Sequence, residues 1–211
     1  MKVLLVNGSP HVKGCVYTAL SEAANALNKE GIDAEIIHIG NQAIHGCIGC
    51  GKCAETGKCV FKDDTVNQFI EKAAESDGFI FGVPVYYGSA NGSMISFMDR
   101  VFFAAHNSGK DIYRLKPAAA VVNARRAGNT ATFDEMNKYF TMSEMPVISS
   151  TYWNMTHGFT PDDVRQDLEG LQTMRTLGRN MAWFLKLKEA GLKAGVPYPE
   201  EEAPVRTHFI R

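Results

Sequence analysis

The feature that most constrains the fold is a regular alternation of short apolar segments with longer amphipathic ones. Runs rich in Val, Ile, Leu, Phe and Ala, typical of buried strands, occur at residues 2–7, 34–39, 78–82, 117–123 and 146–149. Apolar residues at helical spacing occur at 15–30, 65–75, 93–103, 129–140 and from Thr160 onward. Strands that alternate with helices form a parallel sheet joined by right-handed crossovers. The sequence therefore predicts an α/β fold, a doubly wound five-stranded parallel sheet of order 2-1-3-4-5 with helices on both faces.

Length and charge limit the organisation and the partners. The 211 residues suit one domain over 1–190, and the proline-containing segment 191–211 is expected to form an extended C-terminal arm. A formal net charge of −1 creates no long-range field for nucleic acid or an anionic membrane. The chain opens directly on an apolar strand segment, without the pattern of a signal peptide. We therefore expect a cytoplasmic protein with neither nucleic-acid nor membrane partners.

Four of the five cysteines fall within thirteen residues, in the loop 46–60: Cys47, Cys50, Cys53 and Cys59. Their C-x2-C-x2-C-x5-C spacing is close to the run with which bacterial ferredoxins hold iron–sulfur clusters. Structural zinc sites usually combine two C-x2-C pairs across a longer spacer, and disulfides are disfavoured in a reducing cytoplasm. The pattern favours a 4Fe-4S cluster, while a metal-free loop, zinc and disulfides stay open as alternatives.

In a sheet of this order, ligands bind beyond the carboxyl ends of the strands, where three loops meet. The first loop joins a strand to the N-terminus of a helix, whose free N–H groups and positive dipole end favour a phosphate. No G-x-G-x-x-G or P-loop motif is present, so a mononucleotide is expected rather than a dinucleotide. The candidate phosphate-binding residues are Ser9, His11, Gly14, Cys15, Val16 and Tyr17.

The other two loops suit the remainder of such a ligand. Adjacent tyrosines and small residues after the third strand offer stacking surface and close backbone contact to a flat ring, although one tyrosine could instead be core and the other a surface residue. Two arginines after the fourth strand could bind an anionic ring or a nicotinamide cofactor's phosphate, or simply be solvated. The candidates are Pro84, Val85, Tyr86, Tyr87 and Gly88 in one loop and Asn123, Arg125, Arg126 and Gly128 in the other.

These motifs resemble a known family. Gly8-Ser9-Pro10 with Gly14, Pro84-Val85-Tyr86-Tyr87 and the helical Asp99-Arg100 are similar to the motifs of flavodoxin-like NAD(P)H-dependent FMN reductases. The cysteine loop, with Glu55-Thr56-Gly57 and Asp63-Asp64, resembles the branch called iron–sulfur flavoproteins. The resemblance covers about the first 125 residues, and it implies FMN on the three loops with a 4Fe-4S cluster nearby. Cys15-Val16 stands where the family usually has Asn-Thr, so backbone amides and Tyr17 would replace the missing hydroxyl.

The resulting prediction is an FMN-dependent oxidoreductase that takes electrons from NAD(P)H or a reduced carrier and passes them to a small-molecule or redox-protein acceptor. Flavin N5 performs the chemistry, so no catalytic side chain is predicted. The alternatives are a cluster-free reductase of quinones, flavins, nitro or azo compounds, and a non-enzymatic electron shuttle, which usually carries a strongly acidic surface. A homodimer or homotetramer is expected, and Tyr152 and Trp153 are candidate dimer contacts, while Trp153, Asn154 and His157 could instead reach over the flavin.

Overall fold

The computed structural model describes residues 1–110 and 112–209. Its centre is a parallel sheet with neighbouring strands in the order β2-β1-β3-β5-β6, and a short strand, β4, pairs antiparallel with the end of β3. Counted along the chain, the parallel strands have the predicted flavodoxin-like order 2-1-3-4-5. The strands are β1 (Lys2–Asn7), β2 (Asp33–His38), β3 (Gly78–Tyr86), β4 (Ser89–Ala90), β5 (Ala118–Ala124) and β6 (Met155–His157).

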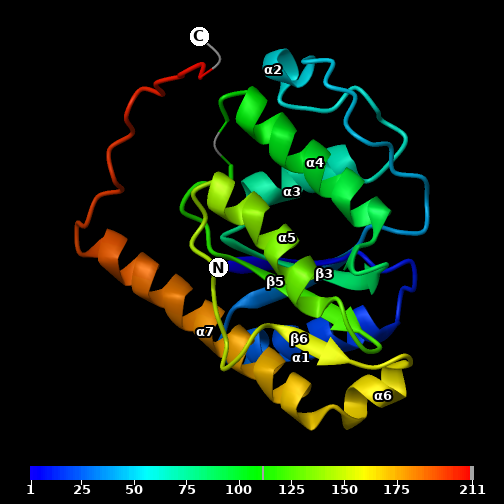
Figure 1. The fold of residues 1–211 in the computed structure, drawn as a ribbon. Coiled ribbons are helices and arrows are strands. Elements are labelled where there is room, and N and C mark those ends of the chain that lie inside the picture. The colour runs from blue at the N-terminus through cyan, green and yellow to red at the C-terminus, as the bar shows by residue number, and fades with distance from the viewer. Residues whose placement is uncertain (111, 210–211) are drawn as a thin grey trace.

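Helices cover both faces of the sheet (Figure 1). One layer contains α1 (Cys15–Lys29) and α7 (Leu168–Lys193), and the other contains α3 (Val66–Ala74), α4 (Gly92–Asn107) and α5 (Asn129–Met142). Two short helices, α2 (Cys53–Thr56) and α6 (Pro161–Gln166), lie in connections. Beyond Lys193 the described chain continues to residue 209 without helix or strand.

The central strands β1, β3 and β5 are largely buried on both faces, which explains their nearly continuous apolar sequences. In β1, Val3 and Leu5 belong to the core on the α1 and α7 side, whereas Leu4 and Val6 belong to the core on the other side. Successive side chains of a strand point to opposite faces, so a strand between two helical layers must be apolar at every position.

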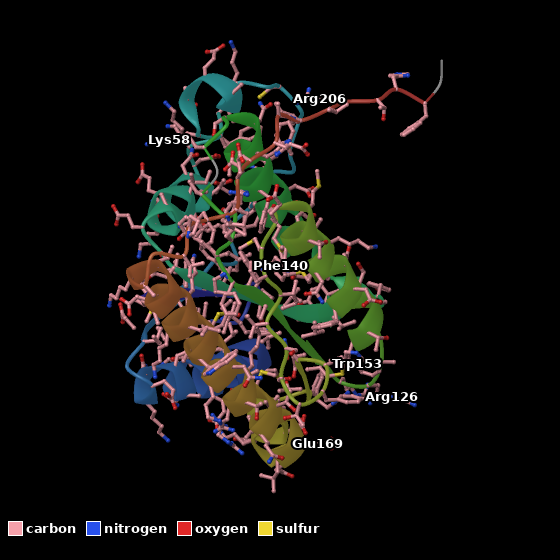
Figure 2. All side chains as sticks on the ribbon, turned by 90° about the vertical axis from the view of Figure 1, so that its left-hand side faces the viewer. Lys58, Arg126, Phe140, Trp153, Glu169 and Arg206 are labelled. Atoms are coloured by element: carbon pink, nitrogen blue, oxygen red, sulfur yellow. The ribbon has the colours of Figure 1, made fainter. Side chains whose placement is uncertain are left out.

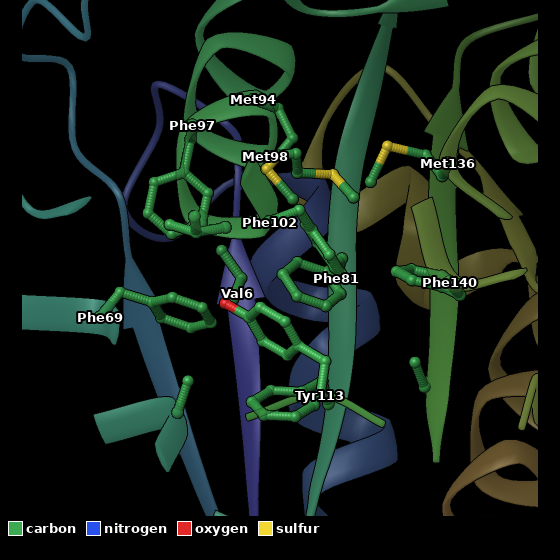
Figure 3. Packing of buried hydrophobic residues seen from close by; sticks show 14 of the residues in the cluster. Val6, Phe69, Phe81, Met94, Phe97, Met98, Phe102, Tyr113, Met136 and Phe140 are labelled. Atoms are coloured by element: carbon green, nitrogen blue, oxygen red, sulfur yellow. The ribbon is translucent and has the colours of Figure 1, made fainter. Parts of the chain in front are cut away.

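The larger core contains a group of packed aromatic rings (Figure 3). Phe81 of β3 lies among Phe69, Phe102 and Phe140, with ring centroids 6.1, 5.8 and 5.4 Å away. Those three rings come from α3, α4 and α5, so one residue of the central strand ties all three helices to the sheet. This packing fixes α4, along which the two candidate sites described below are arranged.

A glycine in β3 sets the position of α1. A Cβ atom added at Gly82 would lie 2.8 Å from Val16 Cγ1 and from Leu20 Cδ1, closer than carbon atoms can approach. Only glycine therefore lets α1 lie directly against the central strand. This contact places the N-terminus of α1 at the carboxyl edge of the sheet.

The fifth strand was predicted in the wrong place. The segment 146–149 makes only an isolated bridge between Ala118 and Val147, and the strand itself is Met155–His157, paired with the end of β5. Buried polar groups hold it, since Thr156 Oγ1 donates to Asn123 Oδ1 at 2.9 Å. The polar composition of this segment hid it from an apolar strand pattern.

The last helix was predicted as one element, but it is broken at Asp167. Thr160 caps α6 with a capping box to Asp163, as its Thr-Pro-Asp-Asp start predicts. Asp167 then leaves helical geometry, with a ψ of 74°, and its side chain accepts a hydrogen bond from Gly170 N at 2.9 Å. This aspartate therefore starts α7 as a new helix.

Candidate functional site

The loop after β1 is shaped by a buried asparagine. Asn7 Oδ1 accepts a hydrogen bond from Ser9 N at 3.1 Å, and Asn7 Nδ2 donates to Val12 O at 3.2 Å. Ser9 Oγ accepts a hydrogen bond from His11 N at 3.2 Å, so the Ser9 hydroxyl oxygen is already hydrogen-bonded within the loop. Asn7 was not among the predicted site residues, because the end of a buried strand shows no sign of such a role in the sequence.

The N-terminus of α1 has no side-chain cap. Gly14 is the N-cap residue and lacks a side chain, and no side-chain hydrogen bond caps this helix. The N–H groups at the start of a helix have no partner within it and carry the positive end of its dipole. Val16 is buried in the core, so it offers a ligand only its backbone, while His11 is exposed. The arrangement suits an anion bound by backbone amides.

Cys15, the first residue of α1, is half-buried. Burial raises the pKa of its thiol above the ordinary value, with a smaller lowering by a backbone hydrogen bond. The side chain is therefore neutral at pH 7. It adds no negative charge beside the uncapped helix end.

The loop after β3 forms a tight hairpin that presents a tyrosine to solvent. Tyr87 has a φ of +52°, an uncommon conformation for a non-glycine residue, and its side chain is fully exposed. The hairpin is held by Glu135 of α5, whose Oε2 accepts from Ser89 Oγ at 2.7 Å and from Ala90 N at 2.9 Å. Tyr86 is half exposed, and Pro84 and Val85 are partly buried. An exposed aromatic ring on a fixed hairpin is available for stacking.

The loop after β5 contacts that hairpin. Gly128, with a φ of +94°, approaches so closely that an added Cβ would lie 2.7 Å from Val85 Cγ1 and 2.8 Å from Gly88 Cα. Arg125 and Arg126 are both exposed. The side chain of Asn123 is already hydrogen-bonded within the protein. Its Oδ1 accepts from Thr156 Oγ1, and its Nδ2 donates to Gly158 O at 3.2 Å. This asparagine therefore links β5 to β6 and to the residue that follows it.

Hydrogen bonds join the loops after β1 and β3 at the sheet edge. Gly8 N donates to Gly82 O at 2.8 Å, and Asn91 Nδ2, at the start of α4, donates to Gly8 O at 2.8 Å. With the contact of Gly128 on Val85, the three predicted loops lie together at one edge. Tyr152 and Trp153 are exposed, with ring centroids 4.4 Å apart, and line a separate pocket with His157 and Asp167. Asn154 is buried, so it cannot reach over a ligand.

The cysteine loop forms a second candidate site. All four clustered cysteines line one small cavity, whose wall otherwise consists largely of apolar residues. Cys47 and Cys50 are exposed, Cys59 is half-buried and Cys53 is buried, and all are free thiols. The lining residues are Cys47, Ile48, Cys50, Gly51, Cys53, Cys59, Val60, Phe61, Arg100, Phe103 and Ala104.

Two side chains of α4 donate hydrogen bonds to these thiols. Arg100 Nε donates to Cys59 Sγ at 3.2 Å, and Asn107 Nδ2 donates to Cys53 Sγ at 3.4 Å. Hydrogen bonds to ligating sulfurs are a general feature of protein metal centres, where they orient the ligands. Neither role was predicted, because both donors lie more than forty residues after the cysteines that they contact.

The four thiols share a cavity but do not form a compact metal-binding group. Among residues 1–110 and 112–209, no three His, Cys, Asp or Glu side chains are grouped closely enough to hold a metal ion. A mononuclear zinc site needs four ligands at about 2.3 Å from one point. The four cysteines that line the cavity are the residue type that ligates iron–sulfur clusters and also zinc, so their side-chain chemistry fits either group.

The two sites lie at opposite ends of α4. Asn91, at the N-terminus of this helix, contacts the loop after β1, whereas Asn107, at its C-terminus, contacts Cys53. The lining of the cysteine cavity begins at Arg100, nine residues after Asn91, which is about 13 Å along the helix. Figure 2 shows the same separation, with Lys58 of the cysteine loop toward the top of the molecule and Arg126 and Trp153 toward the opposite end. Within one chain the two sites are therefore well apart.

None of the helices in the described part of the chain has the length and apolar character needed to cross a membrane.

Comparisons with known proteins identify the family and the fold of the chain. Residues 1–160 match the NADPH-dependent FMN reductase family. An iron-sulfur flavoprotein of Methanocaldococcus jannaschii is 34% identical over 197 residues, which cover 89% of this chain and 98% of that protein. A flavone reductase structure aligns with a TM-score of 0.65 at 19% identity, covering 90% of this chain and 64% of that one. An archaeal flavodoxin aligns at 0.58 with 14% identity, covering 88% and 99%. The chain is thus a flavoprotein oxidoreductase that belongs to the NADPH-dependent FMN reductase family, in its iron–sulfur flavoprotein branch.

Proposed function

We propose that this flavoprotein carries both FMN and a 4Fe-4S cluster and transfers electrons between NAD(P)H, or a reduced carrier, and an acceptor. The observation that carries the proposal is the placement of Cys47, Cys50, Cys53 and Cys59 around one cavity. Two of these thiols accept hydrogen bonds from α4, as ligating sulfurs commonly do.

The residues of the three loops fit FMN. The uncapped α1 terminus binds the phosphate, and the single phosphate site favours a mononucleotide over FAD. Tyr87 and the neighbouring glycine backbone supply surface for the flavin ring, and the exposed Arg125 and Arg126 attract anionic groups at its edge. When bound, FMN supplies hydride acceptance and one-electron transfer. The chain's residues bind and orient it.

The separation of the two sites bears on the assembly. Electron transfer slows steeply with distance, and about 13 Å of α4 separates Asn91, at the flavin loops, from Arg100, where the cysteine cavity of the same chain begins. We therefore propose that the protein works as a homodimer or homotetramer and exchanges electrons with small-molecule or redox-protein partners. Five free thiols suit a reducing cytoplasm.

The test is anaerobic purification from cells supplied with iron. Iron, acid-labile sulfide and flavin are measured per chain, and the flavin is identified by mass spectrometry. We expect one FMN and four irons per chain, with a broad visible absorbance beneath the flavin bands. NADH and NADPH oxidation is then followed with quinone, flavin, nitro and azo acceptors. FMN with NAD(P)H oxidation but without iron or sulfide would refute the cluster and leave a plain reductase, and FMN without NAD(P)H oxidation would indicate that the donor is a reduced carrier.

A further inference from the structure

The most unusual buried group in the chain is the guanidinium of Arg100. It is 1% exposed and is the largest of the fully buried side chains. Asp64, also buried, holds it with two hydrogen bonds, from Nη1 to Oδ2 and from Nη2 to Oδ1 at 3.2 Å. Asp64 Oδ1 additionally accepts from Val66 N at 3.1 Å, which fixes the carboxylate at the start of α3. The orientation of the guanidinium is therefore determined by a rigid partner.

Arg100 also donates hydrogen bonds to the cysteine loop. Nε donates to Cys59 Sγ at 3.2 Å, and Nη1 also donates to His45 O at 3.3 Å. The Phe61 ring lies over the guanidinium at 5.1 Å, and the His45 ring stacks on Phe61 at 4.5 Å. Arg100 thus contacts the chain just before the first cysteine and at the last one.

Stability alone does not explain this arrangement. Burying two charges costs a large desolvation penalty, and apolar residues of similar volume often replace a buried ion pair without loss of stability. Hydrophobic side chains would hold α3 against α4 equally well here, because Phe69 and Phe97 already pack across that interface at 5.0 Å. The donor aimed at Cys59 is what an apolar substitute could not supply.

We propose that Arg100, oriented by Asp64, is a positioning residue that fixes Cys59 and raises the reduction potential of the cluster. The inference rests on the cluster proposed above and goes beyond it. A reduced cluster carries one more negative charge, which spreads onto the ligating sulfurs. A fixed cation that donates N–H to one of those sulfurs stabilises the reduced state more than the oxidised state. Asn107, a neutral donor to Cys53, provides a weaker version of the same contact.

Two variants of the holoprotein separate charge from hydrogen bonding. Arg100→Lys keeps the positive charge beside Asp64 but loses the guanidinium fork that reaches Cys59. The double variant Asp64→Asn with Arg100→Met removes both charges and leaves no buried carboxylate without a partner. Asn107→Ala is the matched control for a neutral donor. Iron per chain is measured first, and the cluster midpoint potential is then obtained by anaerobic titration with electron paramagnetic resonance detection.

We expect all three variants to hold iron and FMN, with midpoint potentials below that of the wild type. The double variant should show the largest shift, equivalent to at least a tenfold weaker tendency to accept an electron, or about 59 mV for a one-electron couple. Arg100→Lys should show an intermediate shift and Asn107→Ala the smallest. If the double variant does not fold, the midpoint potentials of Arg100→Lys and Asn107→Ala still test the role of Arg100.

Two different failures are distinguishable. Wild-type protein without iron would refute the cluster and, with it, this inference. Iron-loaded variants whose midpoint potentials equal that of the wild type would leave the cluster standing and refute the role of Arg100, which would then be structural only.

Discussion

Replacing Gly14 with Asp should weaken FMN binding while leaving the apoprotein folded. Gly14 is the N-cap residue of α1, with φ −83° and ψ −164°, an extended conformation that any residue adopts. Aspartate is among the best N-cap residues because its carboxylate accepts hydrogen bonds from the first N–H groups of the helix. Those N–H groups are the ones that we assign to the phosphate. The new side chain would therefore both compete with the ligand and repel it.

The size of the effect follows from the charges. A unit charge about 6 Å from a phosphate dianion is worth about 5 kcal/mol at an effective dielectric constant of about 20. His11 and Lys13 beside it are exposed, so water reaches the loop and screens the repulsion. We take about half of the unscreened repulsion energy, which is about 2–3 kcal/mol and corresponds to a roughly 30- to 150-fold increase in the Kd for FMN. Because glycine is itself a fair N-cap residue, the new cap stabilises the apoprotein by only about 0.3 kcal/mol, less the cost of moving His11, whose Cβ would lie 2.8 Å from the added Cβ.

The measurement is fluorescence titration of apoprotein with FMN, together with thermal unfolding. Gly14→Asn is the matched control, since asparagine has the same shape and also caps helices but carries no charge. The ratio of the two Kd values isolates the electrostatic part, and it should fall as salt is added. Equal affinities for the Asp and Asn variants would mean that no phosphate binds at α1.

Three further predictions concern the cysteine loop, the hairpin and the core. Cys50→Ser should abolish the iron and keep FMN, because the two sites are separate and serine is a poor ligand for iron; metal and flavin analysis of one preparation tests both halves. Tyr87→Ala should raise the Kd for FMN by about 3- to 10-fold, since stacking contributes about 0.5–1.5 kcal/mol, and Tyr87→Phe is the control that keeps the ring. Gly82→Ala should lower the unfolding free energy by about 1–3 kcal/mol in denaturant titrations, because the added methyl group crowds Val16 and Leu20; an unchanged midpoint would contradict the close packing of α1 on β3.

Much of the fold was predictable because burial on both faces makes the central strands β1, β3 and β5 almost entirely apolar. That pattern identified these three strands, and a shorter apolar run identified the partly buried edge strand β2. It failed for β6, where Thr156 and Asn123 satisfy each other's polar groups inside the sheet. A strand stabilised by paired polar side chains has no apolar signature, so the apolar segment before it was chosen instead.

The break at Asp167 was hidden for a different reason. The apolar positions of α7 continue the spacing of α6, so periodicity alone predicts one helix. The break depends on a tertiary contact, since Asp167 Oδ2 accepts a hydrogen bond from His157 N at 2.7 Å. Periodicity reports which face of a helix is buried, but it carries no information about a partner ten residues away in another element.

The same distinction runs through the two candidate sites. Candidate residues defined by local geometry, such as Gly14 at a helix start or the four cysteines within thirteen residues, could be proposed from spacing. Residues that act by holding those loops could not: Glu135 reaches the β3–β4 hairpin from 46 residues away in the sequence, and Arg100 reaches Cys59 from 41. A charged residue within a helix usually lies on a solvated face. Only the fold shows that α4 turns this arginine inward, against the sulfur of the last cysteine.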